Sequence, residues 1–187
     1  MAVAVSLIVS LTPWAPFILY PFKLFTTWVH ECGHAVMTVI VGGRVTSISI
    51  RPDTSGLTQS LLPVGRVAGG LVASSGYLGA SAVGCLLMAA TRVEKSARII
   101  LLSIGALMLF TLVLWMRNPF GVVVVLAWGV ALVWLARHGM ASTLGFLVSL
   151  LAVQVALNSV YDIRVLFLID RSQSDAATMA RLFLLPS

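Results

Sequence analysis

Apolar residues occur along this chain in long runs that are separated by short polar segments. The runs cover about 2–20, 22–41, 68–90, 98–116, 119–136 and 142–161. A membrane-spanning helix needs about 20 apolar residues, so each run is long enough to cross a bilayer. Because the polar links are mostly short, we expect successive helices to be antiparallel neighbours. The pattern predicts an all-α integral membrane protein with about six transmembrane helices.

Pro13 and Pro16 interrupt the first apolar run, and Pro21 directly follows it. Proline lacks the backbone N–H that a helix interior uses, so we expect a kinked or partly re-entrant first helix that ends near residue 20. No basic residue precedes the run, which argues against a cleavable secretory signal.

The longest segment without helical character runs from Gly42 to about Val67. Gly42 and Gly43 are a helix stop signal. Polar and apolar residues then alternate over 44–50, and turn-forming residues occupy 52–56. Residues 57–61 can form a second strand that pairs with the first. This order predicts a short β-hairpin directly after the second helix, with an ordinary surface loop as the alternative.

Composition supports a membrane protein built as one unit. Of 187 residues, 59% are hydrophobic and 10% are charged, whereas soluble domains carry about 25% charged residues. The six runs leave no room for a soluble domain, so residues 1–187 are expected to form a single polytopic domain. The net charge of +6 is scattered through short loops. It indicates contact with an anionic lipid surface rather than with nucleic acid.

The second run contains the HExxH pattern His30-Glu31-Cys32-Gly33-His34. On a helix, residues four apart lie on one face, so His30 and His34 can bind one metal ion. Glu31 is then placed to take a proton from a water molecule on that metal, as in zinc peptidases. An acidic residue inside a membrane helix costs about 2.5–3.5 kcal/mol, which suggests that it is kept for function.

A catalytic zinc site needs a third protein ligand. Asp162 is the candidate, because it is the carboxylate that ends the last long apolar run. Asn158, one turn earlier on the same face, is a candidate for a hydrogen bond to a ligand or to the substrate. The alternative for Asp162 is a helix-end carboxylate paired with Arg164. His138, Glu94 and Asp53 fit less well, since each lies in a polar loop or turn.

Together these motifs resemble the site-2 protease family of intramembrane zinc metallopeptidases, and within it the short bacterial branch without a PDZ domain. The similar segments are His30 to Ala35, Gly42 to Ile48, the turn through Gly56, Ser75 to Gly79, and Asn158 to Asp162. In the larger family an LDG motif carries the third ligand. The nearest match here is Tyr161-Asp162-Ile163.

The resemblance implies that His30 and His34 bind Zn²⁺, that Glu31 is the general base, and that the hairpin presents the substrate as an added strand. The expected substrate is a transmembrane protein or peptide, paired near Ile48, Ser49 and Ile50. The expected location is a lipid bilayer, the bacterial cell membrane. No oligomeric state follows from the sequence.

Two other functions are compatible with the sequence. One is a non-proteolytic membrane protein that uses its metal site for structure or for binding a partner. The other is a small transporter with discontinuous helices around Pro13 to Pro21. The chain has no internal repeat of the kind found in transporters. Glu31 between two histidines is better explained by hydrolysis.

Overall fold

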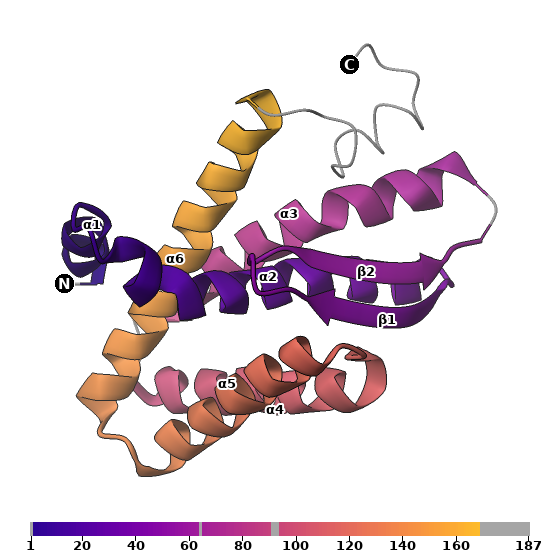
Figure 1. Ribbon diagram of the computed structural model, residues 1–187. Helices are drawn as coiled ribbons and strands as arrows, with labels where there is room; N and C mark the ends of the chain where they lie inside the picture. Colours follow the sequence, from indigo (N-terminus) through magenta and orange to yellow (C-terminus); the bar gives the residue numbers. More distant parts are fainter. Residues whose placement is uncertain (1, 64, 91–93, 169–187) are drawn as a thin grey trace.

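The fold is taken from a computed structural model that describes residues 2–63, 65–90 and 94–168 (Figure 1). Over 160–168 the description covers the helical backbone only. The described elements are helices and one antiparallel pair of strands. In chain order they are α1 (Ala2–Ser10), α2 (Ala15–Ile40), β1 (Arg44–Ile50), β2 (Gly56–Leu61), α3 (Arg66–Ala90), α4 (Glu94–Trp115), α5 (Pro119–His138) and α6 (Ala141–Leu168).

The first two helices divide at a different place from the one expected. α1 ends at Ser10, and α2 begins at Ala15 and continues through Pro21 to Ile40. Pro16 lies in the first turn of α2, where backbone N–H groups have no intrahelical acceptor, so proline is tolerated there. Pro21 removes one hydrogen bond within the second turn, and the rest of this long helix continues regardless.

Four of the described helices are long and apolar enough to cross a membrane, so the expectation of six such helices is wrong. The four segments are Arg66–Ala89, Ser96–Trp115, Pro119–His138 and Ala141–Ser159. α1 has only 9 residues. α2 has 26 residues, but it contains Lys23, Glu31 and two histidines, which lower its hydropathy. The helix that carries the candidate chemistry is therefore the least lipid-like of the long helices.

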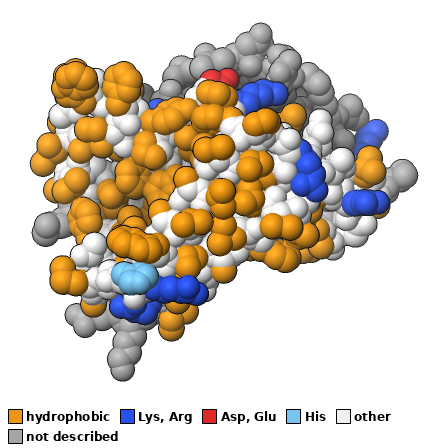
Figure 2. Space-filling model, turned by 60° about the horizontal axis from the view of Figure 1, so that its bottom comes forward, with side chains coloured by type: hydrophobic (Ala, Val, Ile, Leu, Met, Phe, Trp, Pro, Cys, Tyr) orange, Lys and Arg blue, Asp and Glu red, His pale blue; other side chains and the backbone are white. Residues whose placement is uncertain are grey.

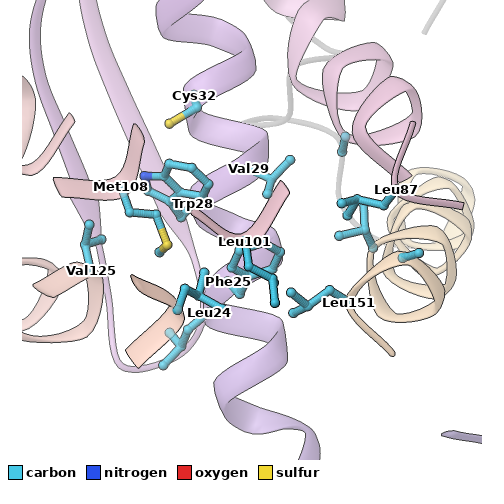
Figure 3. Packing of buried hydrophobic residues seen from close by; sticks show 14 of the residues in the cluster. Leu24, Phe25, Trp28, Val29, Cys32, Leu87, Leu101, Met108, Val125 and Leu151 are labelled. Carbon is cyan, nitrogen blue, oxygen red and sulfur yellow. The ribbon is translucent and has the colours of Figure 1, made fainter. Parts of the chain in front are cut away.

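α2 lies at the centre of the arrangement. In Figure 1 the hairpin covers one side of α2, with α3 along one edge and the α4–α5 pair along the other. α6 crosses at the end where α1 lies. Figure 3 shows Leu24, Phe25, Trp28 and Val29 of α2 packed among side chains of the other helices, with Leu101, Met108, Val125 and Leu151 among them.

The hairpin follows the predicted ranges closely. Gly42 has a φ of +79°, the left-handed conformation that ends many helices at glycine. In the hairpin, Ile48 pairs with Thr58, and Ile50 with Gly56. A bulge between Val45 and Ser47 interrupts the alternation. Val45 is therefore buried together with Ile48 and Ile50, although simple alternation would place it on the other face.

The edge of β1 away from β2 is covered by the link between α4 and α5. The Ile48 carbonyl accepts a hydrogen bond of 3.2 Å from the Arg117 backbone. The Asn118 side chain binds Ile50 twice, accepting from its N–H at 3.1 Å and donating to its carbonyl at 2.6 Å. Asn118 thus replaces a neighbouring strand at this edge and joins the hairpin to the α4–α5 pair.

The outer surface is suited to lipid. Figure 2 shows one face on which hydrophobic side chains cover a broad area, while most Lys and Arg side chains lie towards its margins. Exposed side chains include Val113, Leu86 and Val123, which are 65% exposed or more. A soluble monomer rarely exposes so large an apolar surface.

Candidate metal centre

His30 and His34 direct the same ring nitrogen towards one another. Their Nε2 atoms are 3.0 Å apart, and the two rings meet edge to face with centroids 4.7 Å apart. Tetrahedral zinc holds two imidazole nitrogens roughly 3.3 Å apart, given metal–nitrogen bonds of about 2.0–2.1 Å. The spacing of the two side chains therefore fits a shared metal ion with little movement.

The backbone of α3 orients the ring of His34. Its Nδ1 lies 2.7 Å from the carbonyl oxygen of Val72. A carbonyl only accepts, so Nδ1 carries a proton, and in the neutral ring Nε2 is the acceptor nitrogen that faces Nε2 of His30. Metal-binding histidines typically donate their second ring N–H to an acceptor of this kind. On the other side, the Tyr77 ring packs edge to face on His30, with centroids 4.8 Å apart.

Gly76 of α3 packs closely against the two histidines. A Cβ atom at Gly76 would lie 2.5 Å from Nε2 of His30 and 2.5 Å from Nε2 of His34. Any side chain at Gly76 would thus collide with the Nε2 atoms of both histidines. The close helix crossing that brings Gly76 here depends on Gly33, where a Cβ would lie 2.5 Å from the carbonyl oxygen of Ser75.

Glu31 is buried and held by the hairpin. Its side chain is 5% exposed. The Thr58 hydroxyl lies 2.6 Å from Glu31 Oε2 and 3.1 Å from the Glu31 carbonyl oxygen. Gly56 lies against the same carboxylate, and a Cβ there would be 2.6 Å from Glu31 Cγ. The first residues of β2 therefore form one wall around the carboxylate.

The hairpin turn also forms hydrogen bonds with α2. Tyr20 donates its hydroxyl hydrogen to the Pro52 carbonyl at 2.7 Å, and Thr27 donates to the Thr54 carbonyl at 2.7 Å. Asp53 in this turn accepts hydrogen bonds from the hydroxyl and the backbone of Ser55. These bonds hold the pKa of the Asp53 carboxyl below its usual value. Asp53 is a turn residue and contributes nothing to the histidine site.

α6 reaches the same face of α2 through Asn158. Its side-chain amide donates to the Thr26 hydroxyl at 3.1 Å. Thr26 lies one turn before His30, so Asn158 lies beside the histidine-bearing face. Asp162 comes one turn later in α6, but its side chain lies outside the described part of the structure. Among the described residues no group of three His, Cys, Asp or Glu side chains forms a metal site.

The other candidates lie as follows. His138 ends α5 on the surface, stacked on Trp134. The backbones of Ile48 and Ile50 face the α4–α5 link, and Ser49 pairs with Leu57 of β2. The paired histidine Nε2 atoms beside a buried carboxylate fit a zinc site, with one further ligand required.

Sequence reasoning missed Thr58, Gly56 and the Val72 carbonyl as parts of the site, and it included Gly76 only in a segment that resembles the family. The runs of small residues in α3 and of turn residues in the hairpin were visible. Nothing in their spacing related them to α2, because these contacts join residues 25 or more positions apart.

One family comparison covers the entire chain. The family described as Peptidase M50B-like matches residues 1–187. Among curated proteins and among solved structures, no match to this chain was found.

Proposed function

The chain belongs to the Peptidase M50B-like family, and from this premise we propose that it is an intramembrane zinc metalloprotease that cleaves membrane-embedded substrates. Family membership and the four apolar helices make it an integral membrane protein of a peptidase family. The observation that carries the proposal is the approach of the two histidine Nε2 atoms to 3.0 Å, with Gly76 of α3 packed against both.

In this proposal His30 and His34 hold the zinc ion, and Asp162 is the third ligand. The bond from His34 to Val72 supports the first assignment, because metal-binding histidines typically donate their second ring N–H to an acceptor of this kind. Asn158 supports the second, since its contact with Thr26 draws α6 towards the histidine face. When bound, zinc polarises the scissile carbonyl and lowers the pKa of a bound water towards about 7.

Glu31 acts as the general base and then as the acid in the proposed reaction. It accepts the proton of the attacking water and delivers it to the leaving nitrogen of the cleaved amide. The Thr58 hydroxyl donates a hydrogen bond to Oε2, which orients the carboxylate for this transfer. Burial of Glu31 keeps bulk water away from this transfer.

The substrate is proposed to pair with the outer edge of β2. A helical substrate must unwind before cleavage, and its released backbone groups need partners inside the membrane. Ile48 and Ile50 direct their backbone groups away from β2. Their partners Thr58 and Gly56 therefore direct theirs to the outer edge of β2. In the described part of the chain that edge has no strand partner.

This edge adjoins the Glu31 carboxylate, because Thr58 and Gly56 both contact it. An added strand would pass the proposed base within the reach of one side chain. β1, which contains Ile48, Ser49 and Ile50, is then the inner strand that supports the binding edge. The partners are a transmembrane protein or peptide and the lipid bilayer. The resemblance to the short bacterial branch favours the bacterial cell membrane.

The proposal is tested on the purified full chain in liposomes. We expect about one zinc per chain, and cleavage of a model membrane peptide whose helix is weakened by Gly or Pro. A chelator should abolish cleavage and added zinc should restore it. Zinc binding without cleavage across a broad panel of membrane peptides would instead favour a non-proteolytic metal-binding protein.

A further inference from the structure

An open cavity of about 570 Å³ lies away from the histidine site, where the ends of α2 and α4 meet the start of β1. Arg44 and Arg117 line its polar part, and both residues are exposed. Val39 and Leu114 line its apolar part and are 54% and 39% exposed. The cavity therefore joins two cationic side chains to an apolar surface that is open to the surroundings.

The limits of the helices place this cavity at the boundary of the membrane. One apolar span ends at Trp115 and the next begins at Pro119. Trp115 itself lines the cavity. Tryptophan is enriched where hydrocarbon meets the headgroup layer. The two arginines accordingly lie at the depth of lipid phosphates, and Val39 and Leu114 lie at the outer end of the acyl chains.

The positive charge of the two arginines is not balanced by any carboxylate among the described residues that line the cavity. No Asp or Glu lines it, and among the described residues neither arginine has a carboxylate partner. Arg117 donates to the carbonyls of Leu114 at 2.6 Å and Met116 at 3.0 Å, which holds its guanidinium in place. A guanidinium has five N–H donors, so donors remain for a ligand.

We propose that this cavity binds the phosphate headgroup of one anionic phospholipid, with an acyl chain along Val39 and Leu114. Arginine suits this role, because its planar donors match the oxygens of a phosphate group. The bound lipid would lie at the base of the hairpin, since Arg44 is the first residue of β1. This site is separate from the proposed metal centre and does not depend on proteolytic activity.

The test counts phospholipids retained by the purified full chain in mixed micelles, using native mass spectrometry. Phosphatidylglycerol is compared with phosphatidylcholine of the same acyl chains. We expect one molecule of phosphatidylglycerol to be preferentially retained. Arg44→Gln should weaken its binding about fivefold, and the double change with Arg117→Gln more strongly, as expected for about 1 kcal/mol per basic residue near an anionic lipid surface.

Two control variants make the result specific. Arg66→Gln removes the same charge from the exposed start of α3, outside the cavity, and should leave binding unchanged. Arg117→Lys keeps the charge and should bind better than Arg117→Gln. Equal retention of both lipids, or equal losses for Arg44→Gln and Arg66→Gln, would overturn the proposal. Displacement of the lipid by millimolar inorganic phosphate would assign the site to free phosphate and would also overturn it.

Discussion

The Thr58 hydroxyl of β2 donates a hydrogen bond of 2.6 Å to Oε2 of Glu31 on α2, across 27 positions of sequence. This bond joins the hairpin to the residue proposed as the base. It fixes the rotation of the carboxylate and directs the other oxygen away from Thr58. The hairpin is thus part of the proposed catalytic arrangement as well as a surface for the substrate.

Replacing Thr58 by Val removes this donor with little change in shape. We expect cleavage to fall by roughly tenfold or more, because a hydrogen bond to a charged group contributes about 1.5–3 kcal/mol. Zinc content should not change, since Thr58 contacts neither histidine in the proposed site. Thr58→Ser keeps the hydroxyl and should retain most activity. A fully active Thr58→Val enzyme would show that the bond is not used in the reaction.

Gly76→Ala tests whether the metal binds at the Nε2 atoms of the two histidines. Its Cβ would lie 2.5 Å from both Nε2 atoms, so zinc binding should be lost or severely weakened. Gly79→Ala is the matched control, one turn later in α3, where a Cβ would lie 3.2 Å from the Cα atom of Gly33 and within 4 Å of no histidine atom.

The readout is zinc per chain in protein that remains folded by circular dichroism. Gly79→Ala should retain its zinc although its helix packing is tighter. Full zinc occupancy in Gly76→Ala would place the metal elsewhere.

Asp162→Ala tests the third ligand. Residues that merely orient a ligand typically contribute about 10–100-fold to metal affinity, and loss of a ligand itself should exceed that. Affinity is measured by competition with a chelator of known strength. His138→Ala is the control, since His138 lies on the surface at the end of α5 and should not matter. Unchanged affinity in Asp162→Ala would exclude Asp162 as a ligand.

Asn118→Ala tests the attachment of the hairpin to the α4–α5 pair. The substitution removes two hydrogen bonds to the Ile50 backbone and leaves both backbone groups unpaired. We expect stability to fall by about 1–3 kcal/mol, seen as a lower melting temperature in detergent. Zinc content should be unchanged below the melting transition. An unaltered melting temperature would mean that water replaces the amide without loss.

Local chemistry explains which features the sequence predicted. His30 and His34 lie on one face of α2 because they are four residues apart on a helix. The end of α2 follows from Gly42, which adopts the left-handed φ that glycine tolerates. The strands were predicted at 44–50 and 57–61 and are found at Arg44–Ile50 and Gly56–Leu61. Each of these predictions depends on residues within a few positions of one another.

The features that escaped prediction depend on packing between distant segments. Pro21 was expected to end a helix, but α2 continues through it, and the Pro21 carbonyl accepts a hydrogen bond from the Trp128 side chain of α5. The prediction of six membrane spans treated every apolar run as one span. It did not allow for the polar side chains in α2. Thr58 and Gly76 became recognisable only when the hairpin and α3 were placed against Glu31 and the histidines.

The most direct measurement of the central claim compares wild-type protein with Glu31→Gln in liposomes, recording zinc content and cleavage of a membrane peptide together. Glutamine keeps the size of the side chain but cannot take the proton. We expect equal zinc content and a rate lower by about 10²–10⁴-fold, the usual contribution of general acid–base catalysis. Equal cleavage rates in zinc-loaded wild type and Glu31→Gln would contradict the assignment of Glu31 as the base and the mechanism proposed from it.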